Sequence, residues 1–152
     1  MCWDATDLGG LQTRAYRSDE LCVVVPRGHP LAALKKAQFA DTLHYEQVSL
    51  PVNSAMQVRL QQLAAVLGAT LRHRIIVSNF EAALRVVRAG LAISLVPRTF
   101  AEPVASAFGV KLLALDETWA TRQFVVCFRD EEGLTEPARR LLGYLCPGTS
   151  DK

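Results

Sequence analysis

The sequence lacks the cysteine and histidine spacing of a metal site. Its four cysteines are far apart in the 152-residue chain and form no C-x-x-C pair, and its three histidines stand in no ligand spacing with them. We therefore expect reduced, mostly buried thiols, no bound metal and no cofactor. The residues concerned are Cys2, Cys22, Cys127, Cys146, His29, His44 and His73.

The sequence also lacks a membrane segment and a targeting leader. No apolar run approaches the roughly 18 residues that a membrane helix needs. No basic and apolar leader with a small-residue cleavage site follows Met1. These features predict a cytoplasmic protein without membrane contact.

The chain has little excess charge of either sign. Its 17 basic and 15 acidic residues are scattered along the sequence and leave a formal net charge of +2. A protein that binds the phosphate backbone of a nucleic acid normally presents a dense basic patch. Nucleic-acid binding by this chain alone is therefore disfavoured.

What the sequence has is a core-forming composition and a clear pattern of strands and helices. Half of its residues are hydrophobic, and its length suits one domain or two small lobes. Residues 77–97 have the pattern of a strand end, a helix, a glycine stop and a second strand. Ser78 followed by Glu81 predicts a capping box, and Gly90 predicts the end of the helix. Residues 91–96 predict a strand that is buried on both faces of a parallel sheet.

The same alternation continues on both sides of this unit. It predicts an α/β fold with a mostly parallel sheet, flanking helices and right-handed crossovers. Residues 7–10 predict a turn, and residues 98–108 predict a helix with Pro103 as a defect and Gly109 as its end. Further strands are expected at residues 20–25, 45–50, 72–77, 110–115 and 122–128, further helices at residues 55–67 and after Pro137, and the buried stripe of the last helix at Ala138, Leu141, Leu142 and Leu145.

Two loops that precede helices, residues 49–54 and residues 78–80, form the candidate ligand site. A crevice in an open α/β sheet lies at the carboxyl ends of the strands, where such loops meet. Each loop offers free helical amides, the positive end of a helix dipole and small polar side chains, which suit a carboxylate or another small anion. The predicted binding residues are Asn53, Ser54, Ser78, Asn79 and Phe80.

Structural roles remain open for some of the same residues. Ser54 and Ser78 equally fit helix caps with no other role. Phe80 heads the apolar stripe of its helix and fits a core position. His29 lies between turn-forming residues, which favours a structural role over an acid–base role.

Four stretches together resemble the effector-binding domain of LysR-type transcriptional regulators. Their order and spacing carry the resemblance, which runs over nearly the whole chain. The stretches are residues 17–32 (RSDELCVVVPRGHPLA), residues 49–55 (SLPVNSA), the unit at residues 78–97, and residues 115–120 (LDETWA) with the strand that follows.

The resemblance implies the fold of type 2 periplasmic binding proteins, in which a small molecule lies in the crevice between two α/β lobes. Residues 43–120 would form the second lobe, and residues 1–42 with 121–152 an incomplete first lobe. In this family, positions that match the two candidate loops often line the effector site. Such regulators bind DNA through a winged helix-turn-helix domain, and that domain is not among these 152 residues.

The sequence therefore predicts an effector-sensing domain that binds a small organic, anionic molecule, forms a homo-oligomer and has no enzymatic activity. One alternative is a self-associating interaction module, or a remnant without a ligand function. Another is a small hydrolase with Ser54 or Ser78 as nucleophile and a histidine as base. The hydrolase is disfavoured because the sequence contains no G-x-S-x-G elbow, phosphate loop or clustered metal ligands.

Overall fold

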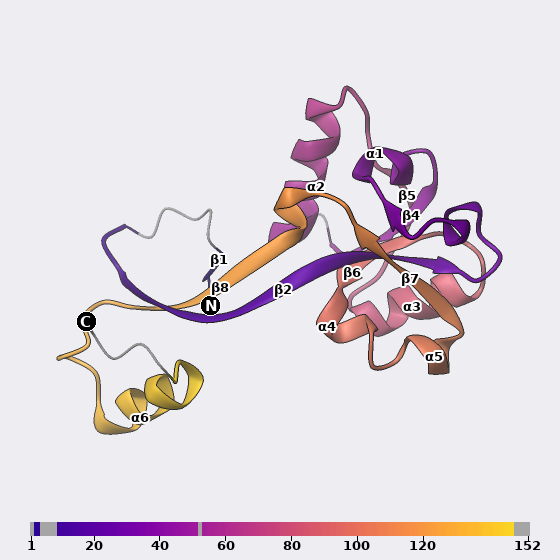
Figure 1. The fold of residues 1–152 in the computed structure, drawn as a ribbon. Coiled ribbons are helices and arrows are strands. Elements are labelled where there is room, and N and C mark those ends of the chain that lie inside the picture. Colours follow the sequence, from indigo (N-terminus) through magenta and orange to yellow (C-terminus); the bar gives the residue numbers. More distant parts are fainter. Residues whose placement is uncertain (1, 4–8, 52, 148–152) are drawn as a thin grey trace. The chain divides into compact units, whose positions relative to one another are not determined.

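The structure is a computed structural model that describes residues 2–3, 9–51 and 53–147. The chain divides into two compact units. Unit 1 comprises residues 1–19 and 121–152, and unit 2 comprises residues 20–120. Strand β2 (Gln12–Pro26) begins in unit 1 and ends in unit 2 (Figure 1).

The second half of β2 organises unit 2. Residues 21–25 are all buried, because consecutive apolar side chains cover both faces of the sheet. Here β2 pairs antiparallel with β6 (Ser94–Pro97) and with β7 (Val110–Leu115). Strand β7 in turn pairs parallel with β3 (Lys36–Ala37).

A second, parallel pair of strands joins β4 (Glu46–Ser49) to β5 (Arg72–Ile76), and a parallel bridge links Gln47 to Ile93. The sheets are therefore mixed. The strand predicted at residues 91–96 is in fact β6, and it runs antiparallel to β2. The strand begins at Ser94 because a turn precedes it. That turn contains Gly90, at φ +74°, and the exposed Leu91.

The helices of unit 2 follow the predicted pattern with one break. The helix expected at residues 98–108 is split around Pro103, because proline lacks the amide that a continuous helix needs. Gly109, at φ +65°, ends the second piece as predicted. The helices are α1 (Phe39–Thr42), α2 (Ala55–Val66), α3 (Phe80–Arg88), α4 (Arg98–Ala101) and α5 (Ala105–Phe108), with short 3-10 turns η1 (Pro30–Ala33) and η2 (Thr118–Ala120).

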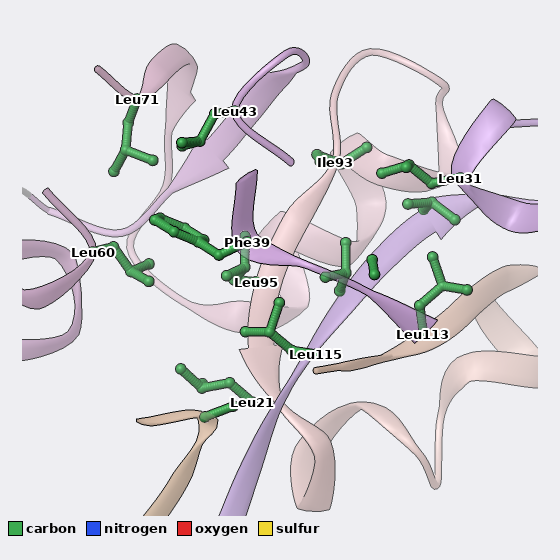
Figure 2. Close-up of a cluster of buried hydrophobic side chains, with 14 of the residues drawn as sticks. Leu21, Leu31, Phe39, Leu43, Leu60, Leu71, Ile93, Leu95, Leu113 and Leu115 are labelled. Carbon is green, nitrogen blue, oxygen red and sulfur yellow. The ribbon is translucent and has the colours of Figure 1, made fainter. Parts of the chain in front are cut away.

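The main core of unit 2 lies around Phe39, which is almost fully buried and meets the edge of Trp119 at a ring-centroid distance of 5.2 Å. Leu60 from α2 and Leu95 from β6 belong to the same cluster (Figure 2). A second cluster joins Leu84 of α3 to β2 and β6. Cys22 is buried in that cluster and its thiol donates to the Val96 carbonyl, and Cys146 of unit 1 is also a buried thiol.

Unit 1 contains β1 (Cys2–Trp3), the first half of β2, β8 (Thr121–Phe128) and α6 (Glu136–Leu145). Strand β1 pairs antiparallel with β8, and β8 neighbours β2. A buried ion pair joins Asp19 on β2 to Arg122 on β8 at 2.8 Å. The predicted stripe of α6 is only partly correct: Leu142 is buried and Ala138 and Leu145 are partly buried, whereas Leu141 is 57% exposed.

The two units divide the chain at residues 19 and 20, whereas the predicted lobes divide it at residues 42 and 43. Residues 20–42 belong to unit 2 because β2 pairs there with β6 and β7 and Phe39 lies in its core. Whether the units correspond to the lobes of the family stays a prediction. Gly9 and Gly10 form a turn, and residues 7 and 8 of the predicted turn lie outside the described residues.

Candidate functional site

A small hollow lies in unit 2 where β4 ends and α2 and α3 begin. Its volume is about 10 Å³, which is room for one water-sized group. Side chains from β4, α2, α3 and β6 surround it. The lining residues are Gln47, Val48, Ser49, Leu50, Met56, Gln57, Leu60, Phe80, Ala83, Ser94 and Leu95.

The first turn of α2 brings Gln57 to this hollow. Ser54 is the N-cap, and its hydroxyl oxygen accepts a hydrogen bond from the Gln57 backbone amide at 3.3 Å, which confirms the predicted cap. The Gln57 side chain is only 2% exposed. Its Nε2 is buried and has no hydrogen-bond partner among the described residues.

Two strands that lie side by side bring Ser49 and His73 together. The Ser49 hydroxyl, at the end of β4, is hydrogen-bonded to Nδ1 of His73 on β5. Ser49 is buried, whereas His73 is exposed. The hydroxyl that lines the hollow is therefore held from the solvent side by an imidazole ring.

The other polar side chains of the lining are satisfied within unit 2. Gln47 donates from Nε2 to the Thr42 carbonyl at 3.1 Å, and the Ser94 hydroxyl donates to the Val48 carbonyl at 3.3 Å. No acidic or basic side chain lines the hollow. The electrostatic character of this place is therefore set by the amino-terminal ends of α2 and α3, which favour negative charge.

The first turn of α3 differs from the predicted capping box. The N-cap is Asn79, whose Oδ1 accepts from the Ala82 amide at 2.9 Å, and the helix begins one residue later than expected. Ser78 lies outside the helix and its hydroxyl oxygen accepts from Asn79 Nδ2 at 3.4 Å. Glu81 pairs with Arg85 one turn along α3, at 2.8 Å, rather than reaching back to the cap.

Of the five predicted binding residues, Phe80 lines the hollow and is partly buried, with its ring 5.4 Å from that of Phe100. Asn79 and Ser54 cap the two helices that begin there, and Asn53 and Ser78 are exposed on the loops before the caps. The roles of all five in ligand binding stay predictions.

Sequence reasoning missed Gln57, and it placed Ser49 at the start of the first candidate loop without naming it as a binding residue. The pattern Ser54-x-x-Gln57 was a usable signal, since it typically marks a capping box in which the glutamine returns to the cap amide. In the structure that amide donates to the Pro51 carbonyl at 2.9 Å, and Gln57 lies in the lining of the hollow. The pairing of Ser49 with His73 has no local signal, because the two residues are 24 positions apart in the sequence.

The hydrolase alternative places a histidine beside Ser54 or Ser78. Neither Ser54 nor Ser78 hydrogen-bonds to a histidine within the described ranges. No group of three or more potential metal-ligating side chains occurs among the residues that the structure describes. In the same part of the chain, no helix has the length and apolar character needed to cross a bilayer.

Residues 2–147 match the family model described as the LysR substrate binding domain. No curated protein matches the chain significantly. Among solved structures, the CcmR regulatory domain of Synechocystis in complex with 2-PG is similar over 99% of this chain and 72% of that one, with 19% identity and a TM-score of 0.82.

The effector-binding domain of QuiR in complex with shikimate is similar over 93% of this chain and 66% of that one, with 20% identity and a TM-score of 0.74. Full-length CbnR in complex with its target DNA is similar over 90% of this chain, with 20% identity and a TM-score of 0.70, and the chain spans 47% of its length. At these identities the similarity establishes a shared fold.

Proposed function

Because the chain belongs to the LysR substrate-binding domain family, we propose that it senses a small organic effector bearing an oxygen acceptor such as a carboxylate. Its α/β fold is the periplasmic-binding-protein-like fold that the sequence resemblance implied. The observation that carries the proposal is the uncharged hollow at the start of α2 and α3, where the amino-terminal ends of both helices favour negative charge.

The ligands of two structural neighbours support the chemistry. QuiR holds shikimate and CcmR holds 2-PG in structures that share this fold. In the present chain, helix amides and the Ser49 hydroxyl offer hydrogen bonds without an acidic side chain in the lining. These groups stabilise an anionic or hydroxylated ligand better than a cation. We expect the chain to bind this ligand without converting it to a product.

Effector binding acts on transcription through a difference in affinity between two conformations. A ligand that binds one arrangement of a regulator more tightly shifts the population toward it. We expect contacts with DNA to come from a helix-turn-helix domain outside these 152 residues. The chain spans about half the length of full-length CbnR, so sensing is the part of regulation assigned to it.

Self-association is the second part of the proposal. Val66 and Leu67, at the end of α2, are 84% and 54% exposed. They border a hollow of about 320 Å³ that also includes Leu63, Phe39 and Trp119. Exposed apolar side chains gathered beside such a hollow are typical of a protein interface. We assign this surface, the α2-end surface, to contact with a second copy of the chain.

The test of effector sensing is a thermal melt of the purified chain against small carboxylates and hydroxylated acids, including benzoate and shikimate. A ligand that binds only the folded state raises the melting temperature progressively with concentration. Ser49→Ala should weaken the shift, whereas Ser106→Ala, an exposed serine on α5, should not. A melting temperature that no compound changes would contradict the proposed function.

A further inference from the structure

We propose that Gln57 binds the ligand directly, because its Nε2 donates a hydrogen bond to one oxygen of the effector. This inference rests on the proposed function and names a residue that the family match does not assign. Gln57 is 2% exposed, lines the hollow, and its Nε2 has no partner among the described residues. Buried amide donors in folded proteins nearly always have a partner, so one without a partner needs an explanation.

The local sequence offers Gln57 a different role, which the structure does not use. In a Ser-x-x-Gln capping box the glutamine side chain accepts from the amide of the cap residue. Here the Ser54 amide donates to the Pro51 carbonyl, and Ser54 still accepts from the Gln57 amide. The cap is therefore complete without the glutamine side chain, which leaves that side chain available to the hollow.

The neighbouring side chains set the ligand chemistry. Gln47 and Ser94 have their donors occupied by backbone carbonyls, and the Ser49 hydroxyl is bonded to His73. The direction of the Ser49–His73 bond depends on which ring nitrogen of His73 carries the proton, so Ser49 can still donate to a ligand. Gln57 is the lining residue whose side-chain donor has no partner at all among the described residues. Because the hollow has room for only one water-sized group, a single carboxylate or hydroxyl oxygen enters it. The remainder of the ligand stays outside, toward the starts of α2 and α3.

This arrangement predicts that the chain binds ligands with an acceptor oxygen in preference to ligands with hydrogen-bond donors only. An ammonium group has hydrogen-bond donors only, so it cannot accept a hydrogen bond from the Gln57 amide nitrogen. Benzoate and benzylamine are probes of similar size and shape that differ in this respect. Benzoate or shikimate should stabilise the wild-type chain, and benzylamine should not.

The experiment compares Gln57→Met with Gln61→Met, which changes an exposed glutamine on the same helix. Without ligand, Gln57→Met should leave the melting temperature unchanged or raise it, because it replaces an unpartnered amide by an apolar group of similar length. It should weaken benzoate or shikimate binding about tenfold or more, as expected for loss of a hydrogen bond to a charged group. Gln61→Met should change neither quantity.

Each contrary result has a distinct meaning. A melting temperature lowered by several degrees in ligand-free Gln57→Met would show that the amide is structural and would overturn the inference. Equal binding by Gln57→Met and wild type would overturn it too, as for an amide that only holds a buried water, and would leave the proposed function standing. Stabilisation of the wild type by benzylamine as strong as that by benzoate would also overturn it. No binding of any probe by the wild type would reject the proposed function and this inference together.

Discussion

His29 lies in the turn between β2 and η1, where hydrogen bonds and a ring contact hold it. Its Nδ1 accepts a hydrogen bond from the Leu31 amide at 3.2 Å, and its own amide donates to the Pro26 carbonyl. The ring is partly buried and meets the edge of Tyr45 at a centroid distance of 4.4 Å. This is the structural role that the surrounding turn residues indicated.

Burial lowers the pKa of His29 below its ordinary value, because desolvation disfavours the charged ring. The unfolded chain therefore takes up a proton at this residue more readily than the folded one. The contribution of the neutral ring is present above the ordinary histidine pKa of about 6.5 and is lost as the pH falls below it.

We predict that urea midpoints at pH 7.5 and pH 5.5 differ less in His29→Asn than in wild type. Asparagine keeps a side-chain acceptor for the Leu31 amide but does not titrate. A His29→Asn variant with the same pH dependence as wild type would contradict this account.

At the scale of elements, α3 is defined by its two ends. Asn79 caps the first turn, and Gly90 follows the last turn at φ +74°. The sequence predicted Ser78 as the cap, which is wrong by one position, because asparagine is as good a capping residue as serine. The structure selects Asn79, whose Oδ1 accepts from the Ala82 amide at 2.9 Å.

We predict that Asn79→Ala lowers the free energy of unfolding by about 1 kcal/mol, because the Ala82 amide loses its acceptor. Ser78→Ala should cost less than half of that, since the Ser78 hydroxyl does not bond to a helical amide. Urea unfolding followed by far-ultraviolet circular dichroism compares the two variants. A larger loss in Ser78→Ala would place the cap at Ser78 after all.

At the scale of the whole molecule, each unit exposes apolar side chains. Val66 and Leu67 lie on the α2-end surface of unit 2, and Tyr144 of α6 in unit 1 is 82% exposed. Either place is a candidate for contact with another copy. The α2-end surface is favoured because its exposed side chains adjoin a hollow whose lining combines apolar groups with the polar side chains of Gln38, Asp116 and Glu117.

We predict that the wild-type chain is a dimer or larger in light scattering at micromolar concentration. The double variant Val66→Glu and Leu67→Glu should be monomeric, because two charges would be buried in the contact without partners. Tyr144→Glu is the control and should keep the wild-type mass. A strictly monomeric wild type would contradict self-association, and a monomeric Tyr144→Glu would place the contact on α6 instead.

The number and order of most elements could be predicted from the sequence. The patterns at residues 55–67 and 77–97 predicted α2 and α3, and Gly90 and Gly109 predicted helix ends that the structure confirms with positive φ values. These features are local, because a cap, a glycine stop or a proline acts within a few residues of its position. The α/β class followed from their order.

How the strands pair and what surrounds the hollow depend on contacts between distant parts of the chain. Strand β6 runs antiparallel to β2, and Ser49 meets His73 across 24 residues of sequence. Gln57 lies in the hollow because the Pro51 carbonyl already satisfies the cap amide of α2. Each of these outcomes depends on groups brought together by chain packing, and the periodicity of a single segment contains no information about them.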